Sequence, residues 1–260
     1  LPTRCSKPCA AGLRPTNGWR VEPLSGSPTL ASRELEGATE LRAGQWLRTD
    51  ERSSARLEVV GLGDVRIEPG SRLRVKEAPR GQRLLDLREG TIHAFITAPP
   101  RVFLVDTPAA RAVDMGCEYA LSVDETGTGR LRVFLGYVQL EGGGRVSTIP
   151  MDGGECSIRS GFGPGTPFFG DASEDLKVAL QRLDFGAGGD ADLSTVLEEA
   201  RGRDGLTLWH LLSRTSGEQR ARVYDRLASL KPPPATVTRQ GVLALDATML
   251  DRWWDDMRPF

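Results

Sequence analysis

Two histidines, His93 and His210, are the only imidazoles with which this chain could move protons near neutral pH. His93 alternates with Ile92 and Ala94 in a strand-like run, so we expect its side chain to face solvent or a partner. His210 follows Trp209 on an amphipathic segment, where a packed or surface position is expected. Neither histidine has a sequence-local catalytic partner, and we predict no hydrolytic triad.

Adjacent acidic residues are the next candidates for chemistry, because a glycosidase needs two carboxylates across a cleft. We expect these acids to be solvated charge on helix faces or turns, since no aromatic-lined run near them indicates a sugar cleft. A phosphate loop at the glycines 142–144 is not predicted, because a strand-like run follows it where a helix would be required. The sequence therefore predicts no enzyme, no catalytic residue and no cofactor. The acidic pairs are Asp124-Glu125, Glu198-Glu199 and Asp255-Asp256.

Four cysteines allow the chain to be fully paired in disulfides. Cys5 and Cys9 lie in a polar lead-in, whereas Cys117 and Cys156 lie in strand-like segments. We predict the pairs Cys5–Cys9 and Cys117–Cys156, because the members of each pair share a similar local structure and the strand pair could be ladder neighbours. The alternative that Cys117 and Cys156 are small buried thiols stays open. No zinc site is predicted, since the chain has no C-x-x-C pair.

The overall composition is that of a soluble globular protein, with 39% hydrophobic residues, 27% charged residues and a formal net charge of -1 over 260 residues. The chain lacks the basic excess that phosphate backbones require, so nucleic acid is not an expected partner. No segment approaches the roughly 20 consecutive apolar residues that cross a bilayer. Because the chain begins with Leu1, we expect that an upstream segment, such as a signal or membrane anchor, was cleaved or left out.

The residues from Trp19 to about Arg159 alternate between apolar and polar, which is typical of half-buried β-strands. Reversals are expected where glycines supply a positive φ, among them Pro69-Gly70 and Glu89-Gly90. No helix-length segment separates the strand-like runs. The sequence therefore predicts a mainly β domain over 18–160, a sandwich or solenoid of about ten short strands, after a lead-in over 1–17.

The character of the chain changes near Pro164. The segment 161–170 carries four glycines and two prolines, a composition typical of a linker. Over 171–260 the apolar residues recur at helical spacing, as they do at Leu193, Val196 and Ala200. Short helices are marginal on their own, so we expect this smaller α-helical region to pack on itself or on the β-domain.

Trp253 and Trp254 near the C-terminus are candidate partner contacts, because tryptophan is enriched in interface hot spots. Adjacent residues of a helix point about 100° apart, so both rings cannot easily enter one core. Two interpretations stay open: one ring contacts a partner, or the last helix docks on the β-domain and buries both rings at its edge. Open strand edges would be a second surface for a partner.

The strand-like segments occur in an order that resembles the FecR-domain family. The late strand departs from the family pattern, with Gly116-Cys117 where the family usually has Gly-Thr, and this also favours a bridge from Cys117 to Cys156. The helical region from about Asp171 to Phe260 does not resemble the β-α-β subdomain that follows the FecR domain in iron-uptake regulators. The matching segments are Trp19-Arg20-Val21, Leu24-Ser25-Gly26, Leu41-Arg42-Ala43-Gly44, Leu47-Arg48-Thr49, Ser54-Ala55-Arg56-Leu57, Val65-Arg66-Ile67-Glu68-Pro69-Gly70-Ser71-Arg72-Leu73, Leu87-Arg88-Glu89-Gly90-Thr91-Ile92, Val105-Asp106-Thr107-Pro108-Ala109-Ala110, Gly116-Cys117-Glu118-Tyr119-Ala120-Leu121 and Val133-Phe134-Leu135-Gly136-Tyr137-Val138-Gln139-Leu140.

This resemblance implies a FecR-like solenoid or sandwich of short antiparallel strands in a bacterial envelope protein. It implies a non-enzymatic role in sigma/anti-sigma signalling by protein contact, in a periplasmic domain tethered to the inner membrane by a segment that precedes this chain. The alternative is a structural scaffold of an envelope assembly, or a module that binds cell-wall polysaccharide. The sequence assigns neither a signal nor an oligomeric state.

Overall fold

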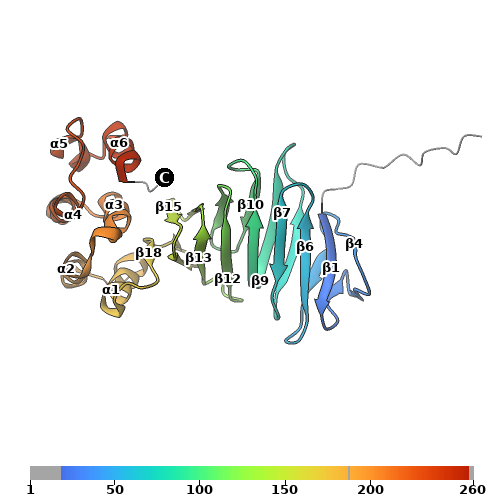
Figure 1. The fold of residues 1–260 in the computed structure, drawn as a ribbon. Helices are drawn as coiled ribbons and strands as arrows, with labels where there is room; N and C mark the ends of the chain where they lie inside the picture. The colour runs from blue at the N-terminus through green and yellow to red at the C-terminus, as the bar shows by residue number, and fades with distance from the viewer. Residues whose placement is uncertain (1–18, 187, 258–260) are drawn as a thin grey trace, which may run out of the picture.

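The computed structural model describes residues 19–186 and 188–257. These residues form an elongated β-domain whose strands follow one another along its length, and the helices pack on one end of it (Figure 1). The strands are β1 (Trp19–Ser25), β2 (Thr29–Leu30), β3 (Arg33–Glu34), β4 (Thr39–Glu40), β5 (Trp46–Arg48), β6 (Ser54–Val59), β7 (Gly63–Ile67), β8 (Arg72–Lys76), β9 (Arg83–Ile96), β10 (Phe103–Asp106), β11 (Arg111–Asp114), β12 (Glu118–Val123), β13 (Gly129–Leu135), β14 (Tyr137–Gly142), β15 (Arg145–Pro150), β16 (Gly154–Arg159), β17 (Gly163–Pro164) and β18 (Phe168–Phe169).

The strands divide into two facing sheets. Sheet A contains β1, β4, β6, β7, β12, β13, β16, β17 and β18 together with the second half of β9. Sheet B contains β2, β3, β5, β8, β10, β11, β14 and β15 together with the first half of β9. Among the described strands every pairing is antiparallel except that of β9 with β10. Among the strands that the structure describes, β15 pairs with β14 alone, so it is an edge of sheet B.

Strand β9 passes from one sheet to the other at Gly90. Its first half pairs with β8 in sheet B, and its second half pairs with β7 and β12 in sheet A. Gly90 has a φ of 100°, and a Cβ atom there would lie 2.3 Å from the Cα atom of Ser71, so only glycine fits. The prediction of a reversal at Glu89-Gly90 was therefore wrong, because the positive φ redirects a continuous strand instead of ending it.

The core of the β-domain lies between the two sheets and is built from the inward residues of each strand. Alternation places successive inward residues of neighbouring strands side by side, and each fully buried Val or Leu contributes roughly 1.5–3 kcal/mol relative to an exposed one. One such row crosses sheet A through the paired residues Val21, Leu57, Val65, Ala94, Tyr119 and Val133, all of them at most 1% exposed.

The prediction of a mainly β fold followed by helices is confirmed. The described chain has more strands than expected, because strands of two residues, such as β2 and β17, are too short to show a period. The segment 161–170, which the composition indicates as a linker, is packed on the β-domain. Within it, β17 and β18 both pair with β16 at the end of sheet A.

The helical region packs around its own apolar core, to which Leu180, Leu193, Leu211, Leu227 and Trp253 belong. The Oγ atom of Ser173 caps the first helix by accepting a hydrogen bond from the N–H of Leu176. Among the described helices none is both long and apolar enough to cross a membrane. The helices are α1 (Glu174–Phe185), α2 (Asp190–Glu199), a 3-10 turn η1 (Gly202–Asp204), α3 (Gly205–Arg214), α4 (Gly217–Leu230), α5 (Arg239–Leu243) and α6 (Ala247–Met257).

The expected disulfide between Cys117 and Cys156 is absent, and both residues are buried free thiols. Cys117 precedes β12 and Cys156 lies in β16, and β13 lies between these strands in sheet A. The Cys117 thiol instead donates to Asp114 Oδ2 at 2.7 Å, and the Cys156 thiol donates to the carbonyl oxygen of Gly165 at 3.1 Å. The prediction of a Cys117–Cys156 pair was wrong because ladder neighbours were assumed where a strand intervenes. The predicted pair Cys5–Cys9 lies outside the described residues.

Candidate functional site

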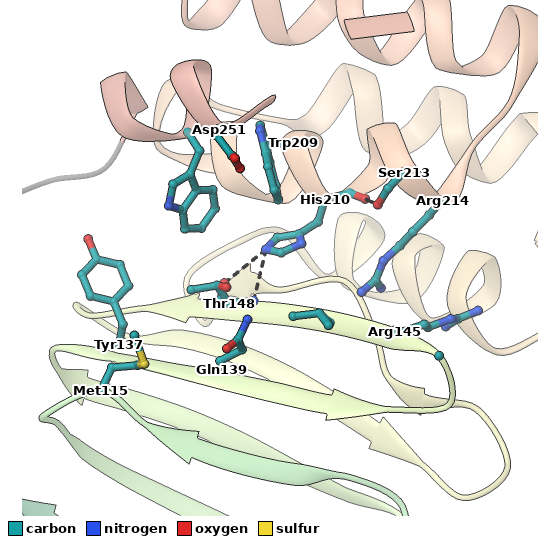
Figure 2. A pocket seen from close by; sticks show the side chains of 13 residues that line it. Met115, Tyr137, Gln139, Arg145, Thr148, Trp209, His210, Ser213, Arg214 and Asp251 are labelled. Carbon is teal, nitrogen blue, oxygen red and sulfur yellow. Dashed lines mark hydrogen bonds between the residues drawn. The ribbon is translucent and has the colours of Figure 1, made fainter. Parts of the chain in front are cut away.

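A cavity of about 720 Å³ lies where the helices meet the β-domain. Its floor is the outer face of β14 and β15, and its roof is formed by α3 and α6 (Figure 2). Its volume falls in the range of roughly 300–1,000 Å³ that is usual for small-ligand sites. The lining side chains of the β-domain are Met115, Tyr137, Gln139, Arg145, Val146 and Thr148, and those of the helices are Trp209, His210, Ser213, Arg214, Asp251 and Trp254.

Two tryptophans form the aromatic wall of this cavity. The ring centroids of Trp209 on α3 and Trp254 on α6 are 4.7 Å apart, and the Trp209 indole N–H donates to the carbonyl oxygen of Leu250 at 3.4 Å. Helix α6 buries Trp253 completely in the helical core, where it contacts Tyr224 at 5.5 Å between centroids. Because adjacent helical residues point about 100° apart, burial of Trp253 turns Trp254 toward the cavity.

His210 lies at the centre of the cavity, and its side chain is buried. Its Nε2 atom is 3.3 Å from both the backbone nitrogen and the carbonyl oxygen of Thr148, on the open edge of β15. Burial and, to a smaller extent, the nearby Arg214 guanidinium together lower the pKa of His210 from 6.5 to about 3. The imidazole is therefore neutral at physiological pH and supplies a polar cap for the strand edge.

Ser213, His210 and Asp251 all line the cavity, but they do not form a triad. The Ser213 hydroxyl donates to the backbone carbonyl oxygen of His210 at 3.0 Å, and the imidazole contacts Thr148. Among the described residues no hydrogen bond joins the three side chains to one another. Nor do the described residues contain a cluster of three or more His, Cys, Asp or Glu side chains that could hold a metal ion.

A buried ion-pair network holds α1 and α3 against the β-domain beside the cavity. The Asp184 carboxylate of α1 lies 2.9 Å from Arg214 Nη1 of α3 and 3.8 Å from Arg145 Nη1 of β15. Arg214 also donates to the hydroxyl groups of Thr166 and Ser147, at 2.9 and 2.7 Å. Such pairing is what makes charges tolerable in a dry interior. Two guanidinium groups share one carboxylate, so this end of the cavity keeps an excess of positive charge.

The predicted partner residues lie in different surroundings. Trp254 lines the cavity, whereas Trp253 has no accessible surface, so a direct partner contact stays a prediction for Trp254 alone. His93 lies on the outer face of sheet A, stacked on Phe134 at 6.5 Å between centroids. Of the polar cavity residues, His210 was a candidate from the sequence, whereas Arg145 and Arg214 were not, because no local spacing connects a strand residue with a helix residue so far along the chain.

Comparison with known proteins identifies the central part of the chain. Residues 45–139, from the residue before β5 into β14, match the family model described as FecR protein. The chain carries a FecR domain. Met115, Tyr137 and Gln139 line the cavity from within the matched segment, whereas its lining residues on β15 and the whole roof lie beyond the match.

The fold comparison gives more distant neighbours. Two crystal structures of a candidate anti-sigma factor from Parabacteroides distasonis are similar to this chain at 16% and 15% identity, with TM-scores of 0.38 and 0.32. The alignments cover 53% and 62% of this chain, and 64% and 65% of those chains, so less than two thirds of either neighbour is matched. No curated protein matches the chain.

Proposed function

We propose that this protein is a non-enzymatic regulator of the bacterial envelope that relays a signal by protein contact, in the manner of FecR-type sigma-factor regulation. The FecR domain supports the regulatory role. The proposal places the described domains on the periplasmic side of the inner membrane, as is usual for FecR-like regulators.

One observation supports the junction of the two parts as the place where the signal is received. The cavity takes its floor from the end of the FecR domain and the strands after it, and its roof from α3 and α6. A molecule bound there would contact both parts at once. A bound molecule can shift the arrangement of the two parts only if it contacts them differently in different states. A cavity that both parts line allows this.

The same residues support binding over catalysis. His210 is neutral and bonded to a strand edge, and the hydroxyl of Ser213 is bonded to a backbone carbonyl group. Trp254, in contrast, is only partly buried, and an aromatic ring at the mouth of a cavity is a typical contact residue.

Affinity capture from native envelopes tests this proposal. The bait is the chain of residues 1–260, beside a Trp254→Ala variant and a Trp46→Ala control, in which the lost ring lies on β5, a strand that pairs with β2 and β8 and does not line the cavity. Partners are identified by mass spectrometry and then rebuilt from purified proteins. A signalling protein, such as an outer-membrane transducer or a membrane protease, should bind wild type and the Trp46→Ala control and be lost with Trp254→Ala. Recovery of structural subunits or wall polymer in its place would support the scaffold alternative.

A further inference from the structure

The floor of the cavity includes an unpaired strand edge. The backbone N–H and C=O groups of Thr148 point away from β14 and meet His210. Residues two apart in an antiparallel strand direct their backbone groups the same way, so the N–H and C=O groups of Val146 also point outward. Val146 is 51% exposed, and no described residue forms a hydrogen bond with these two groups. An unpaired edge of this kind bonds the backbone of an extended chain.

One end of the cavity can take an anion. Arg145 is about one third exposed and uses only Nη1, which donates to the carbonyl oxygen of Asp184 at 3.0 Å. Its Nε and Nη2 groups have no hydrogen-bond partner among residues 19–186 and 188–257. Arg214 lies beside it and shares the same Asp184 carboxylate. A guanidinium group with free donors binds a carboxylate in a forked geometry, which specifies both charge and orientation.

The other end of the cavity is apolar. Tyr137 and the flexible, 39% exposed side chain of Met115 lie together there (Figure 2), and Trp254 also lines the cavity. Asp251, one turn before Trp254 on α6, is exposed, and its carboxylate forms no ion pair or hydrogen bond within the described part of the chain. An apolar ligand group would pack here beside a free negative charge.

We propose that the cavity binds a short extended peptide, with its backbone along Val146, an apolar side chain against Trp254 and a free C-terminal carboxylate on Arg145. The proposal rests on the proposed function, since the peptide would be the signal received at the junction. A peptide is favoured over a neutral oligosaccharide, because Arg145 and Arg214 share the single carboxylate of Asp184, and a sugar would bring no second carboxylate to the Nε and Nη2 groups of Arg145. It would also leave the strand edge without a matching backbone.

Affinity-selection mass spectrometry tests the peptide directly. The chain of residues 1–260 is offered an equimolar tripeptide library with free C-termini, the same library as C-terminal amides, and chitotriose as the sugar probe. Acids with an apolar residue should be retained with a Kd below about 1 mM, and at least roughly 10-fold more tightly than the matching amides. Retention of no tripeptide, equal retention of acids and amides, or retention of chitotriose in their place would each overturn the proposal.

Variants locate the site. Arg145→Gln should weaken binding of the acids by roughly 10-fold and leave the amides unchanged. Trp254→Ala should weaken both classes. Arg159→Gln, a change on β16 outside the cavity lining, should affect neither. The preference for acids over amides is measured on the wild-type protein, so it tests the proposal even where a variant folds poorly.

The two proposals fail separately. If a signalling partner is captured through Trp254 but no peptide is retained, the proposed function stands and the peptide site is wrong. If acids are retained through Arg145 but only structural subunits are captured, the peptide site stands and the signalling role is wrong.

Discussion

His210 should make the protein lose stability in mild acid. The pKa of its buried imidazole is lowered to about 3, whereas in the unfolded chain it is near 6.5. The folded state therefore binds this proton at a lower pH than the unfolded state does. The stability contributed by the neutral imidazole is complete above pH 6.5 and is lost as the pH falls toward the folded pKa. Each pKa unit corresponds to about 1.36 kcal/mol, which gives about 5 kcal/mol in full and about 3 kcal/mol by about pH 4.5.

The perturbation is His210→Gln, which keeps a polar group near the backbone of Thr148 but cannot take up a proton in this range. Denaturant unfolding at about pH 7.5 and about pH 4.5 gives the free energy of unfolding of both proteins. Other titrating groups are common to the two proteins and cancel in the difference. Between these pH values wild type should lose about 3 kcal/mol more than the variant.

A direct titration complements this measurement. The chain has two histidines, so a His93→Asn variant assigns the two imidazole resonances in a proton NMR spectrum. The His210 resonance should not move between about pH 8 and about pH 5, because its pKa is lowered to about 3. Parallel losses of stability in wild type and His210→Gln, or a His210 resonance that titrates near pH 6.5, would refute the reasoning.

Three further outcomes are expected. Burial raises the pKa of Asp114 to about 6, so its carboxylate destabilises the folded state increasingly as the pH rises from about 3.8 to about 6; the stability of Asp114→Asn relative to wild type should therefore rise by about 2.5 kcal/mol between about pH 4 and about pH 8, and no change would contradict this. Asp184→Asn leaves the largely buried guanidinium group of Arg214, and the partly exposed one of Arg145, without their carboxylate and should cost about 3–5 kcal/mol in denaturant unfolding, whereas the control Asp225→Asn removes an exposed ion pair and should cost less than about 1 kcal/mol. Burial raises the pKa of Cys156 to about 12 and raises that of Cys117 as well, so a thiol reagent should label these two only after unfolding; peptide mass mapping separates them from Cys5 and Cys9, and fast labelling of Cys117 or Cys156 in the native protein would contradict their burial.

The β-domain could be predicted from the sequence because alternation is local. In the run from Val65 to Ile67, for example, two apolar residues on either side of a polar one indicate the inward face. Both apolar residues are buried in the structure. The course of the strands could not be predicted in the same way. Gly90 has the positive φ expected of a turn, yet neighbouring strands on both sides extend the pairing through it, so the reversal was misassigned.

Only part of the candidate site could be predicted from the sequence. Trp254 could be selected because two adjacent tryptophans on one helix cannot share a core. Arg145 and Arg214 look like ordinary surface arginines, since their role depends on meeting Asp184 across the junction of two regions. The pairing of Cys117 with Cys156 failed similarly, because the order of strands in sheet A, with β13 between them, is a long-range property.

The helices that cover one end of the β-domain also set its length. A stack of strands built from successive hairpins has no internal reason to stop, because its last edge can accept another strand from any molecule. Here His210 occupies the outward backbone groups of Thr148, and α3 lies beside β15. The helical region thus acts as a terminator for an otherwise open-ended array. Without the helices, the whole edge of β15 would be open to strands of other molecules, and repeated pairing of this kind could build fibres.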